Sequence, residues 1–155
     1  MAELVATAVS VVVACADARA LDVLAPVGAR SCRVAPDELM FVAEPAAAGR
    51  LTRDAGAVTA GDPDAVVIDV SDGWSCWTIA GEGATEAFAR ISELGPPERG
   101  FVCGDVAHVP VRAMGDDGAI HLFVSSMWRD YLREQILSRC QGVHEAGAAT
   151  WGAVT

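Results

Sequence analysis

The sequence contains no lysine, and arginine supplies all 11 of its basic residues. Because 21 residues are Asp or Glu, the formal net charge is −10 and the isoelectric point is about 4.5. Binding to a nucleic-acid backbone or to anionic lipid requires a clustered basic face. The arginines are instead spread along the chain. We therefore expect neither nucleic acid nor a membrane among the partners of this protein.

Long apolar runs are also missing. A membrane-spanning helix needs about 20 apolar residues in succession, whereas the longest run near the N-terminus covers residues 8–15 and includes a serine. A secretory signal begins with basic residues, but the only early charge is Glu3. These features predict a cytoplasmic protein.

The cysteines show no disulfide pattern. Their number is odd, no C-x-x-C pair occurs, and three of them lie in apolar, strand-like runs. In a cytoplasmic chain this pattern favours reduced and mostly buried thiols. The five are Cys15, Cys32, Cys76, Cys103 and Cys140.

Hydrophobic residues, in contrast, are abundant. They make up 52% of the 155 residues, and the mean hydropathy is +0.33. A chain of this length can bury a core of its own. The composition therefore predicts either a large core or an apolar surface that a partner covers.

The hydrophobic pattern predicts two successive groups of elements. The first group consists of a strand at 7–15, a helix at 16–24 that Pro26 ends, strands at 30–35 and 38–43, and a helix from Pro45 to Arg53. Residues 54–65 contain Gly, Asp and Pro with little apolar content, so we expect a linker there.

The second group repeats this order. It consists of strands at 66–70 and 74–80 joined by a hairpin turn at 71–73, a helix at 84–94, strands at 106–114 and 119–124, and a helix from Ser125 or Ser126 to residue 140. The best local match is L-M-F-V at 39–42 against H-L-F-V at 121–124, since a helix start follows each.

We interpret this order as an α+β fold of two similar split β-α-β modules, at about residues 7–53 and 66–140. Together they form a single domain over residues 1–142. The small residues at 143–155 predict a flexible tail.

Four tryptophans are the candidate interface residues. Trp74 and Trp77 are an odd number of residues apart, so a regular strand directs them to opposite faces and only one can fill the core. Trp128 stands at the start of the last helix. Trp151 lies in the tail, where it either anchors a partner or makes no contact.

The G-E-G at 81–83 lies between a strand and a helix, as the glycines of a dinucleotide-binding fingerprint do. The position of the third glycine, however, is Glu86, and Glu82 adds a second negative charge. We interpret the motif as a tight turn whose acidic residues favour the helix dipole.

Cys103, Asp105 and His108 form a small cluster of potential metal ligands or catalytic groups. A zinc site requires a second pair of ligands, which the sequence does not offer nearby. A Cys103–His108 nucleophile and base would need a third, orienting group. We therefore predict no metal and no catalytic residue, and a small Cys/His enzyme is our least favoured hypothesis.

Five segments follow one another in an order typical of a known family. They are R-V-A-P-D-E-L-M-F-V (33–42), D-V-S-D-G-W (69–74), G-E-G-A (81–84), V-A-H-V-P-V (106–111) and F-V-S-S-M-W-R-D-Y-L (123–132). Over residues 25–137 the chain resembles the gamma subunit of heterotetrameric sarcosine oxidase. That subunit is in turn similar to the folate-binding domain of glycine-cleavage T-proteins.

The resemblance implies a structural subunit without catalytic residues, packed against flavoprotein subunits. Other subunits of such oxidases carry FAD, FMN, NAD and zinc, and the large subunit carries the tetrahydrofolate site. The reaction is oxidative demethylation of an amine, with transfer of the one-carbon unit to tetrahydrofolate. Asp69 is a candidate for the folate-binding carboxylate of T-proteins, although a turn explains it equally well.

Two departures from the family limit what the resemblance implies. Residues 95–100 are short for the family, so the amine substrate of the complex stays open. The iron–sulfur-repair relatives of the T-protein carry a stretch with Lys and Tyr beside Gly-Cys, which Cys103-Gly104 lacks. The alternative that remains is a stand-alone folate-binding module.

Overall fold

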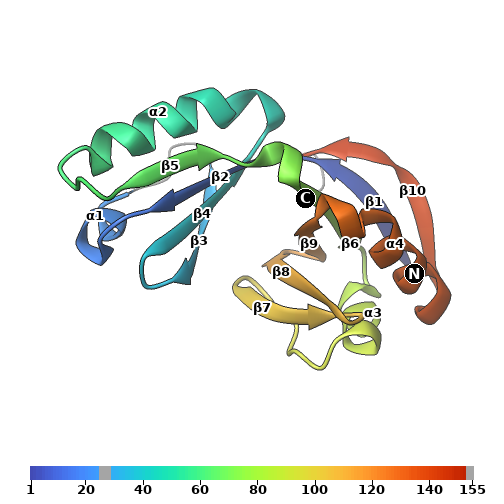
Figure 1. Cartoon of the computed structure of the whole chain (residues 1–155). Helices are drawn as coiled ribbons and strands as arrows, with labels where there is room; N and C mark the ends of the chain where they lie inside the picture. The colour runs from blue at the N-terminus through green and yellow to red at the C-terminus, as the bar shows by residue number, and fades with distance from the viewer. Residues whose placement is uncertain (25–28, 153–155) are drawn as a thin grey trace. The chain divides into compact units, whose positions relative to one another are not determined.

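A computed structural model describes residues 1–24 and 29–152 of the chain. The chain divides into two compact units (Figure 1). Unit 1 consists of residues 1–8 and 72–155, and unit 2 of residues 9–71. These boundaries differ from the predicted modules, because the first strand of unit 1 comes from the N-terminus of the chain.

Unit 2 is a four-stranded antiparallel sheet covered on one face by helices (Figure 1). Its strand order is β3-β4-β2-β5, the order of a split β-α-β pair. Its elements are β2 (Ser10–Cys15), α1 (Ala18–Asp22), β3 (Arg30–Ala35), β4 (Glu38–Ala43), the short 3₁₀ helix η1 (Pro45–Ala47), α2 (Ala48–Thr59), β5 (Val66–Asp69) and η2 (Ser71–Gly73), whose last residues begin unit 1.

The helices of unit 2 form where the sequence supplies caps and an apolar face. Asp17 caps α1 by accepting hydrogen bonds from the backbone of Arg19 and Ala20, at 2.6 and 3.2 Å. The buried residues of α2 include Leu51 and Ala55, four residues apart, and they pack against the sheet.

Unit 1 contains a six-stranded sheet in the order β10-β1-β6-β9-β8-β7. β1 pairs antiparallel with β6 and parallel with β10. Helices α3 and α4 contribute Phe88, Ile91, Leu132 and Ile136 to the core over this sheet. The elements are β1 (Ala2–Ala8), β6 (Trp74–Ala80), α3 (Ala84–Ile91), β7 (Phe101–Val106), β8 (Val109–Asp116), β9 (Ala119–Ser125), η3 (Ser126–Trp128), α4 (Arg129–Arg139) and β10 (Val143–Thr150).

The two units repeat one order of elements, as the sequence predicted. In each, a strand, a helix, two adjacent strands and a second helix follow one another: β2-α1-β3-β4-α2 in unit 2 and β6-α3-β8-β9-α4 in unit 1, where β7 is an insertion. β4 pairs with β2, and β9 pairs with β6. Both β4 and β9 lead into a 3₁₀ helix and then a long helix. The α+β fold of two similar split β-α-β modules is therefore confirmed.

Two predicted boundaries between the modules are wrong. The run at 7–15 is not one strand: it contains the end of β1 and the whole of β2, which belong to different sheets. Residues 71–73 are not a hairpin turn, because β5 pairs with β2 whereas β6 pairs with β1 and β9. A continuous apolar run and a D-G turn look the same whether the chain stays in one sheet or passes to another.

Two further predictions fail for local reasons. Residues 54–59 continue α2 rather than starting a linker, since Ala55 and Thr59 extend its buried face. The predicted strand at 106–114 is interrupted at Ala107 and His108, whose φ angles are +51° and +69°. Positive φ at both residues is the geometry of a tight two-residue hairpin turn, but neither residue type signals it.

The predicted flexible tail is wrong for residues 143–150, which form β10 at the edge of the unit 1 sheet. Pairing with β1 supplies hydrogen bonds that its small side chains do not reveal. The predicted helix end at Pro26 and the last tail residues, 153–155, lie outside the described residues. In the described part of the chain, each helix is too short or too polar to cross a bilayer.

Candidate functional site

Trp77 and Trp74 point to opposite faces of β6, as their spacing predicted. Trp77 is 3% exposed and belongs to the core of unit 1. Its indole Nε1 donates a hydrogen bond of 3.0 Å to the backbone oxygen of Arg129 at the start of α4. Trp74 lies outside that core, half-buried, with the guanidinium carbon of Arg112 4.6 Å from its ring centroid. Trp77 is thus a core residue, and Trp74 a stacking partner of an arginine.

Trp128 is partly exposed, and the apolar residue next to it, Met127, is exposed as well. Trp128 is 39% exposed, and Met127 is 77% exposed. The ring of Tyr131 packs edge-on at 5.9 Å, and the Tyr131 hydroxyl donates to the backbone oxygen of Ala107 at 3.2 Å. Met127 and Trp128 therefore form an exposed apolar projection on the short helix η3, and the Tyr131 ring packs beside Trp128.

Trp151 packs within unit 1, so the interpretation that it makes no contact is wrong. Its backbone N–H donates to the oxygen of Ala8 at 2.9 Å. Its ring lies 4.6 Å from that of His121 and 5.7 Å from that of Phe123. The residue is half-buried. It holds the end of β10 against the sheet.

Close to Trp151, hydrogen bonds link three buried polar side chains, an arrangement that the sequence did not reveal. The hydroxyls of Thr7 and Thr78 are 2.6 Å apart, and Thr78 Oγ1 is 2.9 Å from Nδ1 of His121. These residues come from β1, β6 and β9, and each is at most 6% exposed. The sequence does show one polar residue within each of three apolar strands. Because 71 positions separate Thr7 from Thr78, however, it does not show that these residues meet.

The neighbouring thiol of Cys76 stays protonated near neutral pH. Burial raises its pKa from an ordinary 9.0 to about 12, against the opposing effect of hydrogen bonds from Thr78 and the backbone of Leu122. Burial also raises the pKa of Cys140. As predicted, most of the thiols are buried, namely those of Cys32, Cys76 and Cys140, whereas Cys15 and Cys103 are exposed.

Cys103 is not drawn together with His108, whereas Asp105 and His108 border the same cavity. Cys103 pairs with Arg112, three ladder positions before the Val106–Val109 pair that precedes the turn at His108. At about 3.4 Å per residue, Cys103 is roughly 10 Å from that pair, and His108 lies beyond it. Among the described residues, no three His, Cys, Asp or Glu side chains are grouped so as to hold a metal ion. This geometry does not supply a nucleophile and base in contact.

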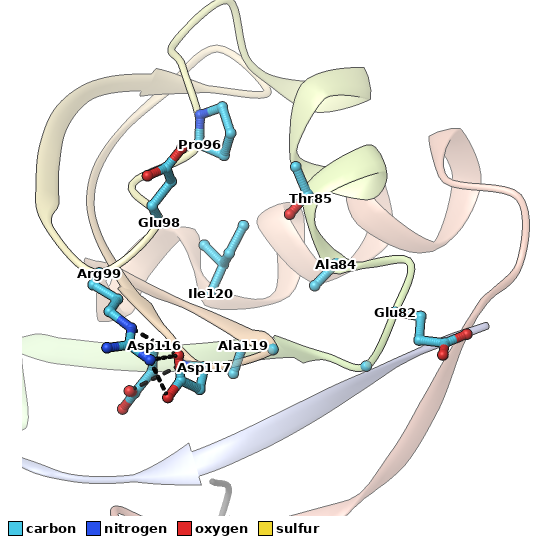
Figure 2. Close-up of a pocket in the computed structure, with 12 residues that line it drawn as sticks. Glu82, Ala84, Thr85, Pro96, Glu98, Arg99, Asp116, Asp117, Ala119 and Ile120 are labelled. Carbon is cyan, nitrogen blue, oxygen red and sulfur yellow. Dashed lines mark hydrogen bonds and ion pairs between the residues drawn. The ribbon is translucent and has the colours of Figure 1, made fainter.

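The G-E-G turn borders a cavity of about 390 Å³ whose charge opposes phosphate binding (Figure 2). Gly81 has φ +102°, and a Cβ there would lie 2.9 Å from the backbone oxygen of Met1, so the glycine is needed for the turn. The cavity is lined by four carboxylates and one arginine, which are Glu82, Glu98, Asp116, Asp117 and Arg99. Arg99 is bound by both oxygens of Asp117, at 2.8 and 2.7 Å.

A second cavity, of about 400 Å³, has a more cationic lining. Arg90, Arg139 and His108 border it together with Glu93 and Asp105. Arg90 also donates to Glu86 one helical turn earlier, at 2.6 Å. An anionic group is better accommodated here than beside the G-E-G turn.

Asp69 has a structural role at the end of β5. Its Oδ1 accepts hydrogen bonds from the backbone N–H and the hydroxyl of Ser71, at 3.0 and 2.5 Å. The Ser71 hydroxyl in turn accepts one from the backbone of Val11 at 2.9 Å. Asp69 therefore stabilises the turn after β5, as the turn interpretation of this residue predicted.

No protein-family profile matches this chain, and no curated protein does. Solved structures match in fold. A chain of heterotetrameric sarcosine oxidase from Corynebacterium sp. U-96 aligns over 89% of this chain and 83% of its own length, with 17% identity and a TM-score of 0.71. The glycine cleavage system aminomethyltransferase T from Bartonella henselae aligns over 94% of this chain, with 14% identity and a TM-score of 0.69.

The present chain spans about half, 47%, of that aminomethyltransferase. The regulatory subunit of aspartate kinase from Thermus thermophilus is a more distant match, with 10% identity, a TM-score of 0.54 and coverage of 89% of this chain and 96% of its own. The fold of this chain is therefore similar to that of sarcosine oxidase and of the T-protein, as the sequence resemblance predicted.

Proposed function

We propose that this protein is a non-catalytic, structural subunit of a flavin-dependent, folate-linked amine oxidase complex of the sarcosine oxidase type. The observation that carries the proposal is the match with the heterotetrameric enzyme. It extends over 89% of this chain and 83% of that chain. The segments quoted from the sequence support the same assignment independently of the coordinates.

In this proposal the cofactors belong to the partner subunits. FAD, FMN, NAD, zinc and tetrahydrofolate would be held there, and this chain would pack against the flavoprotein subunits. The projection of Met127 and Trp128 supports such packing, because exposed Met and Trp are enriched in interfaces.

Co-expression tests the proposal. The tagged chain, produced together with the products of its neighbouring genes, is expected to purify as a yellow complex that oxidises a secondary or tertiary amine. Omission of this chain is expected to reduce the yield of assembled complex rather than the chemistry of each flavin. Recovery of the tagged chain alone, monodisperse and colourless, would contradict the proposal.

A stand-alone folate-binding module is the second candidate, favoured by the fold match with aminomethyltransferase T. The glutamate tail of folate is anionic, so the cavity with Arg90 and Arg139 suits it better than the acidic one. Tryptophan fluorescence during titration with tetrahydrofolate tests this candidate. Saturable quenching that Arg139→Ala weakens would support it, and no quenching below about 1 mM would exclude it.

A further inference from the structure

β5 is an open edge of the unit 2 sheet. The strand order is β3-β4-β2-β5, so β5 pairs with β2 on one side. On its other side, no strand of residues 1–24 and 29–152 is paired with it. Such an edge presents a row of backbone N–H and C=O groups to any strand that can lie beside it.

The edge carries an apolar strip. Val66 and Ile68 are 48% and 51% exposed, whereas Val67 between them packs against the core of unit 2. The register places Val13 of β2 opposite Ile68, and Cys15 opposite Val66. Cys15 is exposed and Val13 is half-buried. The strip therefore extends over two strands on the face away from the helices, and burying it against a partner would be favourable.

Unit 1 shows what the corresponding edge accepts. In the repeat, the place of β5 beside the first strand of the module is taken by β1, and β10 lies on the outer side of β1 in parallel. A side-chain contact accompanies this pairing, since Nε2 of His144 on β10 lies 3.7 Å from Oε1 of Glu3 on β1. The same position in unit 2 has no such strand among the described residues.

The charges around β5 select the kind of strand. Asp64 precedes β5 and Asp69 ends it, and both are exposed. A second copy fits poorly. Antiparallel pairing of two β5 strands would place Asp64 of one copy diagonally across from Asp69 of the other at both ends, and like charges across strands are destabilising. A strand with basic residues at its ends would instead pair favourably with both aspartates.

We propose that β5 is a docking edge for a β-strand of a partner subunit, apolar at its centre and carrying Arg or Lys at both ends. This inference deepens the proposed function, on which the identity of the partner rests. The added strand extends the unit 2 sheet by main-chain hydrogen bonds, and its apolar side chains cover Val66 and Ile68.

A synthetic peptide tests the edge by itself. The probe is a strand of alternating Val and Thr with Arg at both ends, and its control has Glu in place of Arg. With the Arg peptide, the backbone amides of β5 are expected to exchange more slowly with deuterium, and added salt should weaken the effect. The Glu peptide should not protect them. No protection of β5 at about 1 mM Arg peptide would overturn the inference.

Two matched variants locate the binding surface. Ile68→Lys places a positive charge on the apolar strip and is expected to weaken binding of the Arg peptide at least about tenfold, or 1.4 kcal/mol. Val23→Lys changes another exposed valine of unit 2, 68% exposed at the end of α1, and should leave binding unchanged. Equal effects of both variants would contradict docking at β5.

The complex tests the partner. In a complex purified with the flavoprotein subunits, slower exchange of the β5 amides than in the free chain supports the inference. A complex with unchanged β5 exchange overturns it and leaves the proposed function standing. If the peptide binds at β5 but no complex forms, the docking edge stands and the proposed function fails. A dimer of the free chain with β5 already protected would make a second copy the occupant and overturn the proposed partner.

Discussion

The two units share one order of strands and helices but complete their sheets differently. Unit 2 closes with its own fourth strand, β5, which stays at the edge. Unit 1 takes β1 from the N-terminus in that position and adds β10 outside it. Repetition of a module therefore fixes the pairing at its centre, whereas its edge depends on which other segments of the chain are within reach.

The cores of the two units also differ in side-chain size. α2 of unit 2 and α3 of unit 1 each bury two alanines, but α3 adds Phe88 and Ile91, whereas α2 adds Leu51 and Thr59. A small helix face permits close approach to a sheet, and a large one buries more area for each residue. This difference explains why the repeat is visible in the order of elements rather than in residue identities.

The largest effect is expected from removing the ring of Trp151, which holds β10, the strand that unit 1 has and the described residues of unit 2 lack at the corresponding edge. Trp151→Ala loses the contacts with His121 and Phe123. Because the side chain is half-buried, we expect a loss of about 2 kcal/mol in the free energy of unfolding. Chemical denaturation measures it, and hydrogen exchange should show faster opening of β10. Trp128→Ala, at a more exposed tryptophan, is the matched control and should cost less; the reverse order would contradict the assigned role of Trp151.

The raised pKa of Cys76 gives unit 1 a sensitivity to alkaline pH. Below pH 9 the thiol is protonated in both folded and unfolded chains, so its contribution is constant. Between pH 9 and about 12 the unfolded chain loses this proton while the folded chain keeps it. Stability should therefore fall as pH rises, by about 1.4 kcal/mol per pH unit at most.

Denaturation at a series of pH values measures this slope. Cys76→Ala should flatten the dependence above pH 9, whereas Ser75→Ala, at the neighbouring position and without a titratable group, should not. The same slope in wild type and Cys76→Ala would show that another group causes it.

The smallest expected effect is at the β7–β8 turn, which unit 2 lacks because β7 is an insertion in the repeat. His108→Gly removes a side chain held at φ +69°. Glycine adopts this conformation without strain, so we expect the free energy of unfolding to rise by about 0.5–1 kcal/mol. Thermal unfolding checks it. His144→Gly, in the extended strand β10, is the control and should destabilise the protein.

Prediction from the sequence succeeded where the pattern was local. The strands at 30–35, 38–43 and 74–80 have the predicted ends, since each alternates or runs apolar between clear turn signals. It failed at the positions where the chain passes from one sheet to the other within a few residues. Val9 separates β1 from β2 within a continuous apolar run, and Ser71 joins η2 after β5 through bonds to Asp69 and Val11.

The candidate site follows the same division. The opposite orientations of Trp74 and Trp77 could be read from their spacing alone. The packing of Trp151 on His121 could not, because it depends on β10 lying beside β1. Cys103 and His108 are close in sequence, yet the hairpin between them keeps their side chains on different parts of β7 and its turn.

The sequence by itself determined the class of the fold, the repeated order of its elements and the exclusion of a phosphate loop at G-E-G. These depend on hydrophobic period, turn residues and local charge, which act over a few residues. Only the tertiary structure decided that the N-terminal strand completes unit 1, that the tail becomes β10, and that β5 is left as an open edge. Strand pairing joins residues that are far apart in the chain, and short strands of similar composition can pair in several ways until the surrounding elements select one.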